Sequence, residues 1–194
     1  VKEFLQAGVF AQGIFKLLWQ QATERRIDEK KEANHLPVFL WVDEAQLFLS
    51  DYDQIFQTTA RSSRAATVFI SQNISNYYVA LGGANPKAKA DSLLGNLGTK
   101  IFHSNNDAVT NEWASKIIGS DLITLRSDSE QRDRMELVVN SKSQSYAASL
   151  LPQILPKTFT KLWTGGNGYE DPKKNYKVQA IVTINGKDWQ NGKN

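Results

Sequence analysis

The sequence predicts an α/β fold in which helices flank a mainly parallel sheet and a smaller β-rich extension follows. Three short stretches are strand-like, of which the first has the uninterrupted apolar run typical of a strand buried on both faces and the second is β-branched and aromatic like a buried strand. Segments with helical periodicity separate them, and such alternation indicates parallel strands joined by crossover helices. The three stretches are residues 38–42, 67–71 and 99–103. We therefore expect one domain, with the sheet and its helices in residues 1–120 and the extension in residues 121–194.

The composition excludes several classes of protein. The chain has 194 residues, of which 41% are hydrophobic and 22% charged, as in an ordinary globular domain. It has no cysteine, which excludes disulfides and thiolate metal sites. No apolar run reaches the ~20 residues of a membrane helix. The net charge of +3 is too small to indicate nucleic-acid binding by itself, and the lysine-rich residues 156–194 suit either a solvated tail or a binding patch.

The first element is a long amphipathic helix over residues 2–32. Apolar side chains recur in it at three- and four-residue steps, and its end carries mixed charges typical of a solvated face. The apolar positions are Phe4, Ala7, Phe10, Ala11, Ile14, Leu17 and Leu18. The helix ends before Pro37, and we interpret His35 in that break as a loop residue with no functional role.

Further helices are expected between and after the strands. They cover residues 51–61, 75–81 and 87–94, and a last one begins near Asn106 or Asp107 and ends at Ile118. Gly119 suits the position just after that helix.

The extension should begin with two strand-like segments. These are residues 122–126 and 135–140, which could form a hairpin around a charged turn at 127–134. A proline-bounded loop at 150–156 and a last strand at 176–184 follow.

Two adjacent carboxylates follow the first strand directly. Asp43 and Glu44 should lie at the carboxyl end of the sheet, where open α/β sheets bind ligands. In nucleotide hydrolases such a pair forms the Walker B motif, in which the first carboxylate helps to hold Mg²⁺ through water and the second polarises the attacking water. The alternative is that the pair caps the next helix or complements its dipole.

The phosphate-binding loop that normally accompanies this motif is missing. A Walker A loop needs Gly-x-x-x-x-Gly-Lys followed by Ser or Thr, and neither Gly186-Lys187 nor Gly192-Lys193 fits that pattern. The chain is then part of a longer ATPase or a domain that has lost nucleotide binding. Because it begins at Val1 within a predicted helix, we favour a fragment that lacks the Walker A half.

Further polar side chains are candidates for the same site. Arg61 and Arg64 precede the second strand, where arginines commonly complement a helix C-terminus but can also serve as fingers on a transferring phosphoryl group, often from a neighbouring subunit. Gln72 follows that strand, so its amide should lie near Glu44 if the two strands are adjacent. There it could contact a γ-phosphate or the attacking water, or only satisfy loop backbone groups. His103 ends the third strand, and a structural role explains it more readily than a role in a site.

Residues 39–119 resemble the C-terminal half of the motor domain in conjugative coupling ATPases, the TraG/TraD kind of type IV secretion. The resemblance continues more loosely to residue 166. The matching segments are residues 40–46, 59–64, 68–73, 96–102, 113–119, 155–159 and 162–166.

This resemblance implies a RecA-like hexameric ATPase related to the HerA/FtsK translocases. By match of motif, Asp43 would serve Mg²⁺, Glu44 would be the catalytic base, and Gln72 the γ-phosphate sensor. Arg61 would be the trans-acting finger, with Arg64 as the second candidate. ATP and Mg²⁺ would bind the full-length protein, and we expect neither to bind this chain alone, which should be inactive because the Walker A loop is missing.

The resemblance also implies partners and a location. The full-length hexamer would link a relaxase–DNA complex to the secretion channel and drive DNA or protein through it, with DNA in a central channel. It would lie in the cytoplasm at the inner face of the bacterial cell membrane, anchored by an N-terminal part that this sequence lacks. The alternatives are another HerA/FtsK-type motor, a secretion-channel ATPase, or a non-enzymatic docking module for secretion partners.

Overall fold

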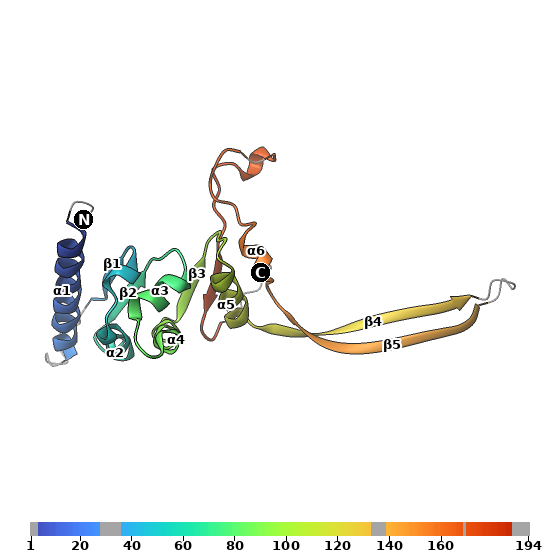
Figure 1. Ribbon diagram of the computed structural model, residues 1–194, viewed down its shortest axis with the longest axis horizontal. Coiled ribbons are helices and arrows are strands. Elements are labelled where there is room, and N and C mark those ends of the chain that lie inside the picture. The colour runs from blue at the N-terminus through green and yellow to red at the C-terminus, as the bar shows by residue number, and fades with distance from the viewer. Residues whose placement is uncertain (1–3, 28–35, 133–138, 169, 188–194) are drawn as a thin grey trace.

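The computed structural model describes residues 4–27, 36–132, 139–168 and 170–187. Figure 1 shows helix α1 at one end of the molecule, small sheets with their helices in the middle, and a long two-stranded ribbon that projects from the other end. The helices are α1 (Leu5–Glu24), α2 (Asp51–Thr59), α3 (Ile74–Leu81), α4 (Pro86–Asn96), α5 (Ala108–Ile118) and α6 (Pro156–Phe159), with 3₁₀ turns η1 (Arg25–Ile27), η2 (Ala45–Phe48) and η3 (Pro172–Lys174). The strands are β1 (Val38–Val42), β2 (Ala65–Phe69), β3 (Thr99–Phe102), β4 (Ser120–Arg132), β5 (Val139–Pro152) and β6 (Ile181–Ile184).

The first two strands pair in parallel, as the sequence predicts. The prediction that the first strand is buried on both faces was wrong, because Phe39 and Trp41 on one face are exposed. Their register runs from Val38 opposite Ala65 to Val42 opposite Phe69. The second strand begins and ends two residues earlier than expected, so Ile70 and Ser71 belong to the loop that also carries Gln72. Both strands therefore end at one edge, and the polar residues that follow them emerge side by side.

The third strand differs from the expectation of a continuous parallel sheet. Within the described residues, β3 pairs with β6 in antiparallel register, and β1 and β2 form a separate parallel pair. The amide of Asn185 also donates to the carbonyl of Gly98 at 2.9 Å, which fixes the end of the β3–β6 pair. The α/β class holds, but a segment about eighty residues further along the chain decides how β3 pairs.

A small apolar core lies between the parallel pair and the helices α3 and α4. Its buried members are Val42, Ala45, Tyr77, Ala90 and Leu93. Val42 and Ala45 flank the two carboxylates, so the core anchors the segment that carries them. Half-buried Phe48 and Phe69 complete the packing around that segment.

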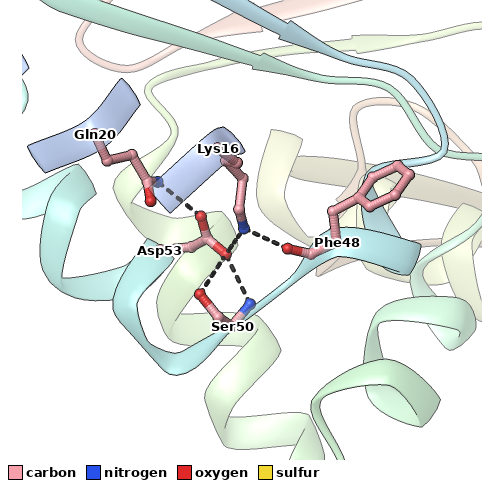
Figure 2. Close-up of polar contacts among 5 residues, drawn as sticks. All are labelled: Lys16, Gln20, Phe48, Ser50 and Asp53. Carbon is pink, nitrogen blue, oxygen red and sulfur yellow. Dashed lines mark hydrogen bonds and ion pairs between the residues drawn. The ribbon is translucent and has the colours of Figure 1, made fainter. Parts of the chain in front are cut away.

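Helix α1 forms within the predicted range, but its apolar side is not the packed one. Phe10 is 70% exposed, while Lys16, Gln20 and Thr23 are buried. Figure 2 shows the reason: Lys16 pairs with the buried Asp53 of α2, and Gln20 donates to the same carboxylate at 2.8 Å.

The same cluster ties α1 to the 3₁₀ turn that follows the carboxylates. The Lys16 ammonium also donates to the carbonyl of Phe48, the last residue of η2. Asp53 in turn accepts from the backbone N–H of Ser50 at 2.7 Å, closing a capping box at the start of α2. Burial lowers the pKa of Lys16, and the hydrogen bond and charge of Asp53 partly offset this effect.

Helix α5 begins and ends as the sequence indicates. The Asp107 carboxylate accepts from the backbone N–H of Thr110 at 2.9 Å, which makes Asp107 the N-cap rather than Asn106. Gly119 follows the helix with a φ of 111°, a conformation that L side chains rarely adopt. The chain then enters β4.

The hairpin of the extension is longer than predicted. Ser120 pairs with Pro152, and the ladder continues to Arg132 opposite Val139. The predicted turn was wrong for residues 127–132, which belong to β4, and the predicted loop was wrong for residues 150–152, which belong to β5. A long register of backbone hydrogen bonds overrides the polar composition that suggested a turn.

The other differences are smaller. The predicted last strand shrinks to β6, with Val178 making an isolated bridge to Thr164. The predictions for His35, for residues 28–32 of the first helix and for residues 133–138 of the hairpin fall outside the described residues. No helix within the described ranges has both the length and the apolarity needed to cross a membrane.

Candidate functional site at the carboxyl edge of the parallel strands

The structure brings Glu44 and Gln72 together at the carboxyl edge of β1 and β2. The Gln72 side-chain amide donates to one oxygen of the Glu44 carboxylate at 3.0 Å. Gln72 is exposed and Glu44 is half-buried. The parallel register explains the meeting, because the two residues follow neighbouring strands that end at the same level.

The backbone of Glu44 has an unusual conformation. Its φ and ψ are 49° and 47°, in the left-handed region, which costs a non-glycine residue on the order of 1 kcal/mol. Glu44 precedes η2, yet its side chain makes no capping hydrogen bond to that turn. The carboxylate reaches the amides of Gln72 and Gln46 instead, so the capping alternative does not describe Glu44.

Asp43 is the exposed member of the pair. One of its carboxylate oxygens accepts from the backbone N–H of Glu44 at 2.9 Å. The other oxygen takes part in no hydrogen bond with the described residues, so the carboxylate keeps acceptor capacity toward solvent. Mg²⁺ is typically held by one or two carboxylates together with waters and substrate phosphates, and an exposed carboxylate beside Glu44 fits that requirement.

Gln46 also belongs to this cluster, although no sequence pattern pointed to it. Its amide nitrogen donates to the second oxygen of Glu44 at 2.5 Å, and its amide oxygen accepts from the Ser71 hydroxyl at 2.7 Å. The Glu44 carboxylate is therefore held by one amide from each side. The spacing Glu44-x-Gln46 was visible in the sequence, but only η2 turns the second side chain back onto the first.

Asn105 is a second residue without an assigned role. It lies in the loop between β3 and α5, and its side-chain amide donates to the main-chain carbonyl of Gln72 at 2.7 Å. The sequence showed only a polar run after the third strand. His103 in the same loop is exposed and forms no hydrogen bond within the described ranges, so its assignment to a structural role stays a prediction.

Arg61 and Arg64 lie at the opposite edge of the parallel strands. They line an open pocket of about 380 Å³ together with Pro37, which precedes β1, and Gln57 of α2. The Arg64 carbonyl accepts from the amide of Val38 at 3.0 Å, which places it at the beginning of β1. A five-residue strand spans roughly 15 Å, so within one chain the structure does not bring either arginine to Glu44.

Taken together, the carboxyl edge offers an exposed carboxylate, a carboxylate fixed by two amides, and an amide that is itself exposed. A fixed carboxylate in this setting can accept a proton from water, and an exposed amide beside it can contact a phosphoryl oxygen. Such an arrangement suits hydrolysis of a phosphoanhydride whose phosphates are bound by another part of a protein.

Comparisons with known proteins bear on the family and the fold of the chain. The family model described as "TraM recognition site of TraD and TraG" matches residues 37–157, a range that contains every candidate residue. A solved structure of the bacterial conjugative coupling protein TrwBdeltaN70, in an unbound monoclinic form, aligns with a TM-score of 0.55 and 14% sequence identity. The alignment covers 86% of this chain and 33% of that one, so the chain spans about a third of its length. No curated protein matches the sequence. The alignment with the coupling-protein structure confirms the predicted RecA-like α/β class at the level of the fold.

Proposed function

The chain belongs to the family of the TraM recognition site of TraD and TraG, and from this premise we propose that it forms part of the motor of a conjugative coupling ATPase. The full-length protein would assemble as a hexamer and use ATP to move DNA or protein into a type IV secretion channel. The observation that carries the proposal is the contact between Glu44 and Gln72 beside the exposed Asp43. The family match favours a conjugative coupling ATPase over another HerA/FtsK-type motor.

The residues would divide the chemistry of hydrolysis. Asp43 would hold Mg²⁺ through water, and the metal would neutralise charge on the phosphates. Glu44 would accept the proton of the attacking water, because two amides hold its carboxylate in one orientation. Gln72 would contact the γ-phosphate and change its contact with Glu44 once that phosphate leaves.

The position of the arginines supports an assembly of several subunits. Arg61 and Arg64 lie at the far edge of the strands from Glu44, so an arginine finger for this site would come from a neighbouring subunit. Arg61 is the first candidate by motif. A ring that presents one subunit's far edge to the next subunit's Glu44 would satisfy both positions.

The partners follow from the same reading. The family description names TraM recognition, so we expect a TraM-type protein of the relaxase–DNA complex to bind the full-length protein. We place the ATPase in the cytoplasm at the inner membrane face, with DNA in a central channel and the secretion channel as its downstream contact.

The test is a Glu44→Gln variant of the full-length protein that contains this chain. ATP hydrolysis should fall by at least 10²-fold, because the carboxylate that accepts the proton is lost, and transfer of DNA between cells should fall with it. Glu112→Gln, an exposed residue of α5, is the matched control and should keep both activities. The chain alone should not hydrolyse ATP measurably, and turnover by it that disappears with Glu44→Gln would contradict this part of the proposal.

A docking module is the second candidate, and the exposed apolar residues favour it. Phe39 and Trp41 of β1 are 60% and 68% exposed, and several apolar side chains of α1 are exposed as well. The same variant separates the two functions. DNA transfer that persists in Glu44→Gln would indicate docking without catalysis.

A further inference from the structure

Asn105 lies where three parts of the fold meet. Its side-chain nitrogen donates to the carbonyl of Gln72, in the loop after β2. Its side-chain oxygen accepts from the backbone N–H of Asp107 at 2.7 Å, at the start of α5. Its own amide donates to the carbonyl of Phe159 at 3.3 Å, at the end of α6. Asn105 itself is half-buried, and its bond to the Gln72 carbonyl is exposed to solvent.

The remaining main-chain group of Asn105 is fixed as well. Its carbonyl accepts from the side-chain amide of Asn111 at 2.9 Å, and Asn111 is 4% exposed. Both main-chain polar groups and both side-chain polar atoms of Asn105 are thus hydrogen-bonded. A residue with this many hydrogen bonds has little conformational freedom, and it therefore also restricts the group to which its side chain is bonded.

The group that it holds is the backbone of Gln72. The Gln72 side chain, which is exposed, reaches Glu44 from that backbone. The loop after β2 is also fixed on its far side, because the backbone N–H of Ile74 donates to the buried Thr110 hydroxyl at 2.9 Å. Loss of the Asn105 bond would remove the hydrogen bond to the main-chain carbonyl of Gln72 itself, while the neighbours Ser71 and Ile74 stay bonded to other elements.

We infer that Asn105 is a positioning residue for Gln72, fixing the main chain from which the Gln72 amide reaches Glu44. The inference rests on the function proposed above, in which that amide acts on the phosphoryl group. In this proposal Asn105 contacts neither the γ-phosphate nor the attacking water, and it acts only through Gln72. Because it is also bonded to α5 and α6, the geometry of the site depends on how these helices are packed.

A substitution at Asn105 can separate its side-chain contact with Gln72 from its side-chain contact with Asp107. Asn105→Asp keeps an oxygen for the Asp107 amide but replaces the donor to Gln72 with an acceptor. Asn105→Ala removes both contacts. Asn106→Ala is the matched control, since Asn106 is the exposed neighbour and its side chain forms no hydrogen bond within the described ranges.

In the full-length protein, Asn105→Asp and Asn105→Ala should each lower kcat for ATP hydrolysis by about 10- to 100-fold. The KM for ATP should change less than threefold, because the phosphate-binding loop is elsewhere. Asn106→Ala should match the parent. Without nucleotide, amides of residues 70–74 should exchange with deuterium faster in Asn105→Asp than in the control, a readout that does not depend on activity.

A double-mutant cycle with Gln72→Ala distinguishes positioning from a general structural role. If Asn105 acts through Gln72, adding Asn105→Asp to Gln72→Ala should lower kcat by less than a further twofold. A full additional loss in the double variant would overturn the inference. Normal kcat in Asn105→Asp, in a protein that Glu44→Gln inactivates, would overturn it while leaving the proposed function standing. If Glu44→Gln remains active, the proposed function fails first and the inference fails with it.

Discussion

The side-chain amide of Gln72 lies 3.0 Å from the carboxylate of Glu44, although 28 residues separate them in the sequence. The contact exists because β1 and β2 are parallel neighbours in register, with Val42 opposite Phe69. The residues that follow each strand therefore emerge at one edge. Around this contact the structure adds Gln46 on the other side of Glu44 and Asn105 behind Gln72.

Gln46 should matter to catalysis through the orientation of Glu44. In the full-length protein, Gln46→Ala removes the amide bonded to the second carboxylate oxygen, so we expect kcat for ATP hydrolysis to fall about tenfold with little change in KM. Steady-state kinetics measure both. Gln12→Ala, an exposed glutamine of α1, is the control. A kcat within twofold of the parent would show that the Gln72 contact suffices to orient Glu44.

Arg61 should act across a subunit boundary. In the full-length protein, Arg61→Ala should reduce ATP hydrolysis on the order of 10³-fold if it is the finger, whereas Arg64→Ala should have the smaller effect. Mixing inactive Arg61→Ala with inactive Glu44→Gln subunits should restore part of the turnover, because some neighbours then combine one intact finger with one intact base. No recovery in the mixture, or a loss below tenfold for Arg61→Ala, would move the role to Arg64 or remove it.

The buried pair of Lys16 and Asp53 should contribute strongly to the stability of the chain. Lys16→Met leaves the Asp53 carboxylate buried without its cation, and breaking a buried pair in this way costs about 3–5 kcal/mol. Urea unfolding followed by circular dichroism measures the free energy. Lys89→Met is the matched control, because its pair with Asp51 is largely exposed and should cost less than about 1 kcal/mol. Equal effects of the two variants would show that burial of the pair is not what matters.

Tyr77 should make the chain less stable at high pH. Burial raises the pKa of Tyr77 to about 12 against an ordinary value of 10, with a hydrogen bond to Ser71 acting in the opposite direction. The folded chain thus keeps this proton to higher pH than the unfolded chain does. The contribution of this shift to the stability of the folded chain is fully present below pH 10 and is lost as the pH rises from 10 to about 12.

Between pH 10 and about 12, the free energy of unfolding should fall by roughly 2–3 kcal/mol because of Tyr77. Tyr77→Phe should remove this decrease. Unfolding free energies of parent and variant, measured at several pH values between 9 and 12, give the difference. Tyr176→Phe, at a tyrosine that is 78% exposed, is the control and should keep the slope of the parent. A Tyr77→Phe chain whose stability falls as steeply as the parent's would contradict this assignment.

The sequence could predict the elements whose causes are local. The strand before Asp43 and Glu44 was found because five consecutive apolar residues are typical of a buried strand. The prediction that both of its faces are covered was wrong, because Phe39 and Trp41 are exposed. The start of α5 was narrowed to Asn106 or Asp107 and its end was found at Gly119, because acceptor side chains and glycines are signals read from adjacent residues. The placement of Gln72 near Glu44 followed from the alternation of strands and helices, which indicated parallel neighbours.

The sequence could not predict what depends on segments far apart in the chain. The exposed face of α1 is apolar because an ion pair between residues 37 positions apart buries the polar face. The pairing of β3 with β6 and the length of the β4–β5 ribbon depend on backbone partners that composition does not reveal. The roles of Gln46 and Asn105 depend on where a 3₁₀ turn and a loop place their amides.

By itself, then, the sequence determined the family, the α/β class and the two carboxylates with the glutamine that meets them, since short-range patterns encode strands, caps and motifs. Only the tertiary structure decided which face of α1 is buried, which side chains hold Glu44 and Gln72 in place, and that Arg61 and Arg64 lie at the opposite edge of the strands. The physical reason is that hydrogen bonds and ion pairs between distant segments form only once the chain has folded, and many alternative partners are equally compatible with the local sequence.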